Sequence, residues 1–336
     1  MFHVVTGGSG SGKSAFAEEL ICKYHLESRA DGLAGNLIYV ATMIPYGEET
    51  MQKIHRHQMM REKKGFFTME CYIGLESLSK SEFFQKDHGK PCILLECMSN
   101  LTANEIYEPD GAGVYTAERI LQGIKDLRQV SCHLVIVTNE VCSDSAEDSK
   151  EMKFYKQVLS KVNLEMAEMA DGVTEVVYGI PVTVKGKPFR NMKEGTAEKE
   201  MGQQETLRMV VGGAYQGKRK FAEKLYGNLH WANGRDCPLE EVYTCEGMYH
   251  FEKYIRRMLK EGREFKGLAD SIARKNPGLV ILADEIGCGL VPMDAFERKY
   301  REQAGRICTE LAELSLRVDR VVCGVGIPLK NEEKRI

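Results

Sequence analysis

Residues 4–14 read Val-Val-Thr-Gly-Gly-Ser-Gly-Ser-Gly-Lys-Ser, a short apolar run that leads into a glycine-rich loop and then into a helical pattern. The loop satisfies GxxxxGK[ST], which in this strand–loop–helix context is typical of a phosphate-binding loop. Its glycines let backbone N–H groups converge on a phosphate, and the helix N-terminus adds the positive end of its dipole. We expect Lys13 to neutralise phosphate charge and the Ser14 hydroxyl to ligate Mg²⁺. The predicted phosphate-binding residues are Gly7, Gly8, Ser9, Gly10, Ser11, Gly12, Lys13 and Ser14.

A second loop of the same kind lies in LRMVVGGAYQGKR, residues 207–219. Gly212 and Lys218 match the first loop at an offset of 205, but Arg219 stands where the metal-binding hydroxyl is needed. Arginine cannot ligate Mg²⁺ because its side chain has no acceptor atom. The second loop is therefore either a structural remnant, or a site that still binds a nucleotide or phosphate without Mg²⁺-assisted transfer.

The repeat extends beyond the two loops. LVIVTNEV (134–141) resembles LVILADEI (279–286), and VTEVVYGIPVTVK (173–185) resembles VDRVVCGVGIPLK (318–330), both at an offset of 145. The offset between the copies thus falls by 60 after the loop. The second copy lacks about sixty residues, all between its loop and its DEI strand.

Apolar runs of strand length alternate with helical patterns through the first copy. Strands that are apolar on both faces are typical of parallel sheets covered by helices on both sides. We therefore predict an α/β fold, with a doubly wound and mostly parallel sheet, duplicated in tandem with a shortened second domain. The predicted boundaries are 1–188 for the first domain, 189–205 for a charged linker and 206–336 for the second domain.

Composition excludes several classes of protein. The chain of 336 residues is 43% apolar and 28% charged, which is enough for two globular domains. A formal charge of −3 does not favour nucleic-acid binding, and no run of eighteen apolar residues predicts a membrane span. The 11 cysteines lack zinc-site spacing, so we expect reduced thiols in a cytoplasmic protein.

The segment 48–64 has helical spacing and carries a basic stripe. Lys53, His57 and Arg61 recur every four residues and therefore share one helix face. A neutral imidazole between two cations suits nucleophilic attack on a nucleotide α-phosphate, because the cations hold the polyphosphate and favour the neutral ring. The same spacing also fits a solvated basic helix face, and His55, on a different face, is an alternative nucleophile.

Polar residues stand where predicted strands end. Glu96 closes the run ILLE, and in P-loop folds an acidic residue at such a position commonly assists Mg²⁺. The alternative is a strand-terminal acid that faces solvent. Open α/β sheets bind ligands at this carboxyl edge. Similar strand-end positions are held by Thr68, Glu70, Asn139 and Glu140.

Taken in order, these motifs resemble the adenosylcobinamide kinase / adenosylcobinamide-phosphate guanylyltransferase family. The resemblance covers about 1–188 and rests on GGSGSGKSAFAE, YVAT, KIHRHQMMR, FTME, ILLECMSNL, VTNEV and ADGVTEVVYGIP. It implies a RecA-like P-loop domain, usually a homotrimer, that phosphorylates adenosylcobinamide and then transfers GMP from GTP to adenosylcobinamide phosphate. GTP and ATP would be substrates, and Mg²⁺ the cofactor.

The resemblance also implies roles for individual residues. His57 is similar to the histidine that carries GMP covalently, and Ser14 and Glu96 would hold the metal ion. The family's RIxxHxxxR helix matches with Lys53 in place of its first arginine. The implied nucleotide contacts outside the loop are Ala41, Thr42, Met43, Lys53, Arg61, Glu70 and Glu96.

The second copy resembles the family in a different part. DEIGCGLVPMDAFERKYREQAGRICTELAE (284–313) is similar to the family's NEVGxGIVP continuation, which VTNEVCSDS in the first copy lacks. The segment 248–262 offers His250, but not in an RIxxHxxxR frame. We expect a family-like second domain without nucleotidyl transfer. Two further hypotheses are a P-loop small-molecule kinase without nucleotidyl transfer, and a second copy that serves as a binding or assembly module.

Overall fold

The structure is a computed structural model that describes residues 1–48, 51, 54, 55, 59, 61, 64–81, 89–141, 149–188 and 206–332. The chain divides into two compact units. One comprises Met1–Gly7, Lys13–Glu175 and Thr183–Pro188, and the other comprises Gly8–Gly12, Val176–Val182 and Phe189–Ile336. No helix among the described residues is both long enough and apolar enough to cross a membrane.

The first sheet has seven strands in the order β3-β2-β4-β5-β1-β6-β7. The strands from β1 to β6 pair in parallel wherever their register is defined. The strands are β1 (Phe2–Thr6), β2 (Ala34–Ala41), β3 (Phe67–Glu70), β4 (Lys90–Glu96), β5 (His133–Val137), β6 (Gly172–Val177) and β7 (Ile180–Lys185).

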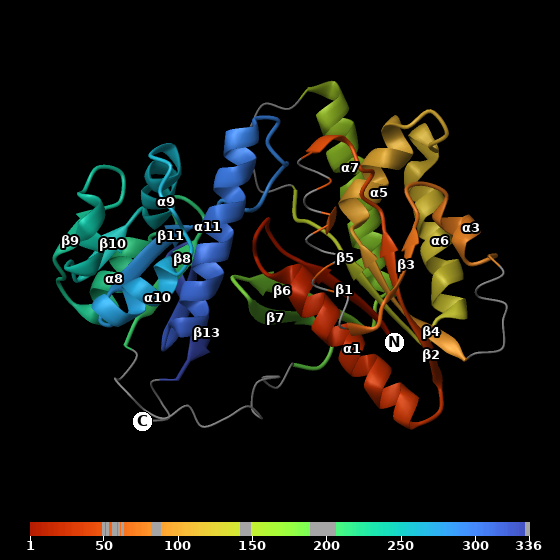
Figure 1. The fold of residues 1–336 in the computed structure, drawn as a ribbon, viewed down its shortest axis with the longest axis horizontal. Coiled ribbons are helices and arrows are strands. Elements are labelled where there is room, and N and C mark those ends of the chain that lie inside the picture. The colour runs from red at the N-terminus through yellow and green to blue at the C-terminus, as the bar shows by residue number, and fades with distance from the viewer. Residues whose placement is uncertain are drawn as a thin grey trace. The chain divides into compact units, whose positions relative to one another are not determined.

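Helices cover both faces of this sheet, which explains its unbroken apolar strands. α1 packs against β2, β4 and β5, while α6 packs against β5 and α7 against β1. Figure 1 shows α1 on the opposite side of the strands from the group α5, α6 and α7. The helices are α1 (Lys13–Ala30), α3 (Leu75–Leu78), α5 (Met98–Tyr107), α6 (Thr116–Val130) and α7 (Lys150–Met169), with a 3₁₀ turn η2 (Gly113–Tyr115).

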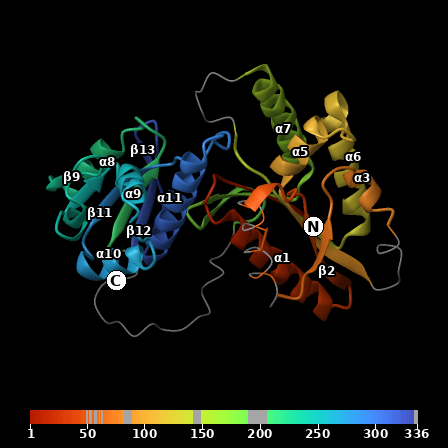
Figure 2. The ribbon, with the colours of Figure 1, turned by 45° about the horizontal axis from the view of Figure 1, so that its top comes forward.

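The second sheet has six strands in the order β13-β12-β8-β11-β10-β9. All of its pairs are parallel except the antiparallel pair β12–β13. Its strands are β8 (Arg208–Gly212), β9 (Trp231–Asn233), β10 (Gly247–Tyr249), β11 (Val280–Asp284), β12 (Arg317–Val322) and β13 (Val325–Asn331). Its helices are α8 (Lys218–Tyr226), α9 (Phe251–Lys260), α10 (Leu268–Lys275) and α11 (Ala295–Leu314), with a 3₁₀ turn η3 (Leu239–Tyr243). Figure 2 shows this sheet with α11 along one side of it.

The two sheets have the same strand order. β8 lies between β11 and β12 as β1 lies between β5 and β6, so β9, β10 and β13 occupy the places of β2, β4 and β7. In the described residues β3 has no counterpart in the second sheet. The predicted α/β fold, its duplication and its shortened second copy are therefore confirmed.

A two-residue hairpin turn closes each copy. Tyr178 and Gly179 have φ angles of 45° and 80°, and Cys323 and Gly324 have φ angles of 49° and 82°. Positive φ at both central residues is the type I′ geometry that matches the twist of a hairpin. The same turn thus follows β6 and β12, in the two segments that the sequence repeat had aligned.

Candidate active site

The first glycine-rich loop, Gly7–Ser14, connects β1 to α1 and is called the first cradle below. Gly7 and Gly12 have φ angles of 152° and 85°, in the region that L-residues with side chains rarely adopt. The carbonyl of Ser11 accepts a hydrogen bond of 2.7 Å from Gly179 N. α1 begins at Lys13, directly after the glycines. This geometry presents the N-terminus of an 18-residue helix to any anion at the loop.

Ser14 and Glu96 meet at the start of α1. The Ser14 hydroxyl donates to Glu96 Oε1, and the Tyr39 hydroxyl donates to Glu96 Oε2 at 3.2 Å. Both carboxylate oxygens are therefore held. Burial, followed by the charge of Glu96, raises the pKa of Tyr39 well above its usual value, so Tyr39 remains a donor. The structure thus brings together Ser14 and Glu96, the two residues predicted to hold the metal ion.

Arg61 stacks on the ring of Tyr39 and lies close to Glu18. Its guanidinium carbon is 3.4 Å from the centre of the Tyr39 ring, and Nη1 is 4.0 Å from Glu18 Oε1. Arg61 is only 5% exposed, and its Nε and Nη1 have no hydrogen-bond partner among the described residues. Lys64 Nζ completes the group at 2.6 Å from Glu18 Oε2. A chain of contacts thus links the end of the basic helix to Glu96 and Ser14.

The predicted nucleophile cannot be placed. His57 and Lys53 lie outside the described residues. The described residues of the same segment are helical from Gly47 to Arg61, and His55 is exposed. The predicted helix is thus present in the part of the segment that the structure describes.

The other predicted contacts fall at the carboxyl ends of β2, β3 and β4. Ala41 pairs with Glu70 on one side and with Glu96 on the other. Glu70 is exposed. Burial, followed by a hydrogen bond with Glu70, raises the pKa of Tyr72 to about 12. Met43 is half-buried. These residues lie at the same edge of the first sheet.

Thr42 has a structural contact that the sequence did not predict. It is fully buried, and its hydroxyl donates to Cys97 O at 2.8 Å and accepts from Cys97 N at 2.7 Å. Asn104 Nδ2 donates to Thr42 O at 2.9 Å. Thr42 therefore fastens the loop after β2 to the loop after β4, which keeps Glu96 at the edge.

Of the other strand-end polar residues, Asn139 forms hydrogen bonds with α5 and α7. Its Nδ2 donates to Ser99 Oγ at 2.9 Å, and Asn163 Nδ2 reaches its carbonyl at 3.4 Å. Glu140 is half-buried and Thr68 is exposed. Asn139 therefore ties the start of α5 and the body of α7 to the end of β5.

The second cradle, Gly212–Arg219, keeps the backbone of the first. Gly212 and Gly217 have φ angles of 146° and 86°, and Gly324 N donates to Gln216 O at 2.9 Å. A Cβ atom on Gly212 would lie 2.4 Å from Val321 O, so only glycine fits there. These values parallel those of Gly7, Gly12 and the Gly179 bond in the first copy.

The lysine of the second cradle, Lys218, forms hydrogen bonds with the backbone of its own loop. Lys218 Nζ lies 2.5 Å from Asp284 Oδ1 and donates to the carbonyls of Gly212 and Gly213 at 3.2 and 2.6 Å. An ammonium group has three donors, and these contacts use three. Lys218 is 9% exposed. Its charge is therefore neutralised within the protein.

Arg219 and Tyr249 take the places of Ser14 and Glu96, the pair predicted to hold a metal ion in the first copy. Arg219 Nε donates to Glu223 Oε1 at 2.9 Å, and its guanidinium lies 5.0 Å from the centre of the Tyr249 ring. Tyr249 ends β10 in the register that Glu96 has in β4. The second copy thus has a cation and an aromatic ring where the first has a hydroxyl and a carboxylate.

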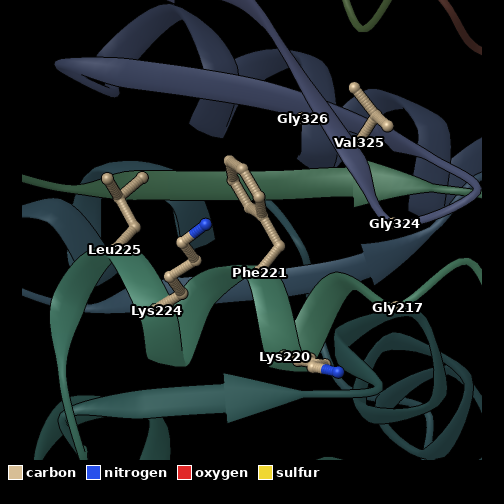
Figure 3. Close-up of a pocket in the computed structure, with 8 residues that line it drawn as sticks. All are labelled: Gly217, Lys220, Phe221, Lys224, Leu225, Gly324, Val325 and Gly326. Atoms are coloured by element: carbon tan, nitrogen blue, oxygen red, sulfur yellow. The ribbon is translucent and has the colours of Figure 1, made fainter.

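A pocket of ≈ 550 Å³ lies along α8, on the second copy. Figure 3 shows Phe221, Lys224 and Leu225 pointing from α8 toward the strands, whereas Lys220 points the other way. Phe221 packs so closely on Gly326 that a Cβ atom there would lie 2.0 Å from its ring. The pocket is lined by Gly217, Lys220, Phe221, Lys224, Leu225, Gly324, Val325 and Gly326, and by neither Lys218 nor Asp284.

The sequence profile of the family described as cobinamide kinase / cobinamide phosphate guanyltransferase matches residues 3–184 and 247–329. The chain belongs to this family. The family match confirms the expected resemblance and identifies the chain as a transferase. Its second range covers β10 to β12 and most of β13. The second cradle lies outside both matched ranges.

Three curated relatives each align over their whole length. The bifunctional adenosylcobalamin biosynthesis protein CobU of Salmonella typhimurium is 29% identical over 196 residues, and that of Escherichia coli is 26% identical over 196 residues. Each alignment covers 55% of this chain and 100% of the relative. The CobP protein of Pseudomonas aeruginosa is 25% identical over 189 residues, covering 56% of this chain and 100% of that protein.

The structure adds two functional candidates that the sequence reasoning missed. Tyr39 lies in the YVAT motif, which predicts no role for its side chain, but its hydroxyl donates to Glu96. Asp284 lies in the repeated strand LVILADEI, and its carboxylate neutralises Lys218. The sequence signal for Asp284 is its position at the end of an apolar run, which is also the position of Glu96.

Proposed function

We propose that the first copy catalyses both reactions of its family. It would transfer a phosphoryl group from an NTP to the hydroxyl of adenosylcobinamide, and then GMP from GTP to adenosylcobinamide phosphate. The observation that carries this proposal is the contact between Ser14 and Glu96 at the head of α1, beside Lys13. The names of the relatives, bifunctional adenosylcobalamin biosynthesis proteins, agree with it. We place the reactions in the cytoplasm, where ATP and GTP are available.

The donor atoms at the cradle fit Mg²⁺. A serine hydroxyl and a carboxylate are oxygen ligands, which Mg²⁺ prefers. In the structure the hydroxyl proton bridges the two groups, and Tyr39 holds the second carboxylate oxygen. Ser14 and Glu96 would hold the ion, which supplies charge neutralisation at the phosphates when bound. Lys13 and the loop N–H groups would position the nucleotide phosphates.

For the guanylyl transfer we propose His57 as the nucleophile. A ring nitrogen of His57 would attack the α-phosphorus of GTP, forming a P–N bond while the P–O bond to pyrophosphate breaks. A phosphate oxygen of adenosylcobinamide phosphate would then attack the same phosphorus, and the P–N bond breaks to regenerate the imidazole. Lys53 would stabilise the leaving pyrophosphate. Arg61, stacked on Tyr39, would anchor the helix to the cradle.

The test is covalent labelling with GTP that carries ³²P at the α-phosphate. We expect acid-labile, base-stable label on the protein, lost in His57→Ala and kept in the matched variant His55→Ala. A phosphoramidate has this stability because its P–N bond is cleaved once the nitrogen is protonated. Undiminished label in His57→Ala would exclude His57, and absence of label in the parent would exclude the covalent route.

We propose that the second copy does not transfer nucleotides. Lys218 is neutralised by Asp284, and Arg219 and Tyr249 stand in the places of Ser14 and Glu96. In the described residues the second copy also has no strand equivalent to β3. A binding or assembly role for the second copy is consistent with this sheet edge, which keeps its backbone but carries different side chains. This holds whether or not several copies of the chain associate.

A further inference from the structure

A cluster of metal-ligating side chains lies at the carboxyl edge of the second sheet. His250 follows β10, Glu252 lies in the first turn of α9, and Asp284 ends β11. One ligand atom from each lies within 4.8 Å of those of the other two. His250 Nδ1 is 3.5 Å from Glu252 Oε1. Three elements therefore converge with one nitrogen and two oxygen donors.

Glu252 is the member of the cluster that most requires an explanation. It is 1% exposed, and its Oε2 accepts a hydrogen bond of 3.1 Å from Asp284 N. Its Oε1, also buried, has no hydrogen-bond partner among the described residues. Burial, and then the nearby charge of Asp284, raises the pKa of Glu252. A buried carboxylate oxygen without a partner is costly, and a bound cation would remove that cost.

Among the described residues, Lys218 does not form a hydrogen bond with Glu252 Oε1. Lys218 Nζ lies 2.5 Å from Asp284 Oδ1 and gives its other donors to two loop carbonyls. A carboxylate has two oxygens, so Asp284 can pair with Lys218 through Oδ1 and still contact a second cation. His250 has a φ angle of 57° as the residue before α9, which sets its ring beside the first turn of that helix.

We propose that the second copy binds a divalent transition-metal ion through His250 Nδ1, Glu252 Oε1 and Asp284. One imidazole and two carboxylates are a ligand set that suits zinc and related ions. Two ligands at about 2.1 Å from a tetrahedral ion stand about 3.4 Å apart, close to the 3.5 Å between His250 Nδ1 and Glu252 Oε1. Three protein ligands leave one coordination position for water or an anion.

The first copy cannot form this site. By strand register Tyr249 takes the place of Glu96, so His250 stands where Cys97 stands in the first copy. By the sequence offset Asp284 stands where the first copy has Asn139, an amide. The site therefore distinguishes the second copy from the first, and its presence does not depend on the function proposed for the first copy.

A second group of potential ligands provides the control. Cys92, Cys132 and His133 also lie within reach of one another, on the first sheet. Thiolate ligands give Co²⁺ an intense charge-transfer absorption that nitrogen and oxygen ligands do not. Co²⁺ substitution therefore separates the two clusters by spectrum, and His133→Ala separates them by mutation.

The experiment uses the full chain stripped of metal with a chelator. Zn²⁺ affinity is measured by competition with a chromophoric chelator, and the Co²⁺ form is examined by absorption. The variants are His250→Asn, Glu252→Gln and the control His133→Ala. Asparagine tolerates the left-handed backbone of His250. Fluorescence of Trp231, the sole tryptophan, and circular dichroism verify the fold.

We expect one Zn²⁺ per chain, weakened roughly 100-fold in His250→Asn and in Glu252→Gln and unchanged in His133→Ala. The Co²⁺ form should show visible d–d bands without thiolate charge transfer. If His250→Asn fails to fold, Glu252→Gln decides. The proposal is overturned if the parent binds no Zn²⁺ below about 10 μM, if folded variants bind as the parent does, or if the Co²⁺ spectrum is that of a thiolate and is lost in His133→Ala.

Discussion

The two cradles have nearly the same backbone and opposite side-chain chemistry. Gly7 and Gly212, and likewise Gly12 and Gly217, have φ angles within a few degrees of one another. In the first copy Ser14 meets Glu96, two oxygen donors that fit a metal ion. In the second, Lys218 is held by Asp284 and by its own loop. The second loop thus keeps the backbone of the first without its pair of oxygen donors.

The largest expected difference concerns catalysis. Lys13→Met should lower both transferase rates by roughly 10³-fold, because it removes the cation that neutralises the transferred phosphates. Lys218→Met should leave both rates within about twofold. Steady-state turnover with GTP and with cobinamide measures this contrast. Comparable losses in the two variants would show that the second cradle is also catalytic.

The second expected difference concerns stability. Lys218→Met removes the ammonium group that pairs with Asp284 and should destabilise the second copy by about 3 kcal/mol, since breaking a largely buried ion pair is costly. The sole tryptophan, Trp231 in β9, reports unfolding of this copy in urea. Lys218→Met with Asp284→Asn should recover part of the loss. An unchanged midpoint in Lys218→Met would mean that the pair contributes nothing.

The third expected difference concerns how the stability of each copy depends on pH. Burial lowers the pKa of His3 in β1 to about 4, against the opposing effect of Asp171, while Arg208 stands at this place in β8. Between the folded and unfolded pKa values only the unfolded chain binds the proton, so acid favours unfolding. The first copy should lose about 2 kcal/mol between pH 7 and pH 5.

Amide exchange in β1 and β8 measures this effect in each copy. Exchange in β1 should rise as the pH falls, after correction for the intrinsic rate, and His3→Gln should remove most of the rise. Exchange in β8 should change little. An equal rise in β1 of the parent and of His3→Gln would assign the acid sensitivity to another group.

The smallest effect should be equal in the two copies. Ser149 caps α7 by accepting from Met152 N at 3.2 Å, and Asp294 caps α11 by accepting from Glu297 N at 2.8 Å. Ser149→Ala and Asp294→Ala should each cost about 1 kcal/mol, because each leaves a helix N–H unpaired. Amide exchange in each helix measures the cost. Strongly unequal costs would contradict the idea that the architecture is retained in both copies.

The strands of both sheets could be predicted because they are continuous apolar runs. The sequence repeat also indicated which strand of the first copy corresponds to which strand of the second. The sequence also brought Ser14 and Glu96 together, since a P-loop and a neighbouring strand end share one edge. It did not predict that Tyr39 holds Glu96, because a tyrosine within an apolar run reads as core. Nor did it predict the pair of Lys218 and Asp284, which are distant in sequence and meet only through strand register.

The most direct test of one working nucleotide site is the number of GTP molecules bound per chain. Equilibrium dialysis of the full chain with GTP and Mg²⁺ gives this number for the parent, Lys13→Met and Lys218→Met. We expect one GTP per chain in the parent and in Lys218→Met, and loss of binding in Lys13→Met. Two GTP per chain in the parent, or one retained in Lys13→Met and lost in Lys218→Met, would contradict this expectation.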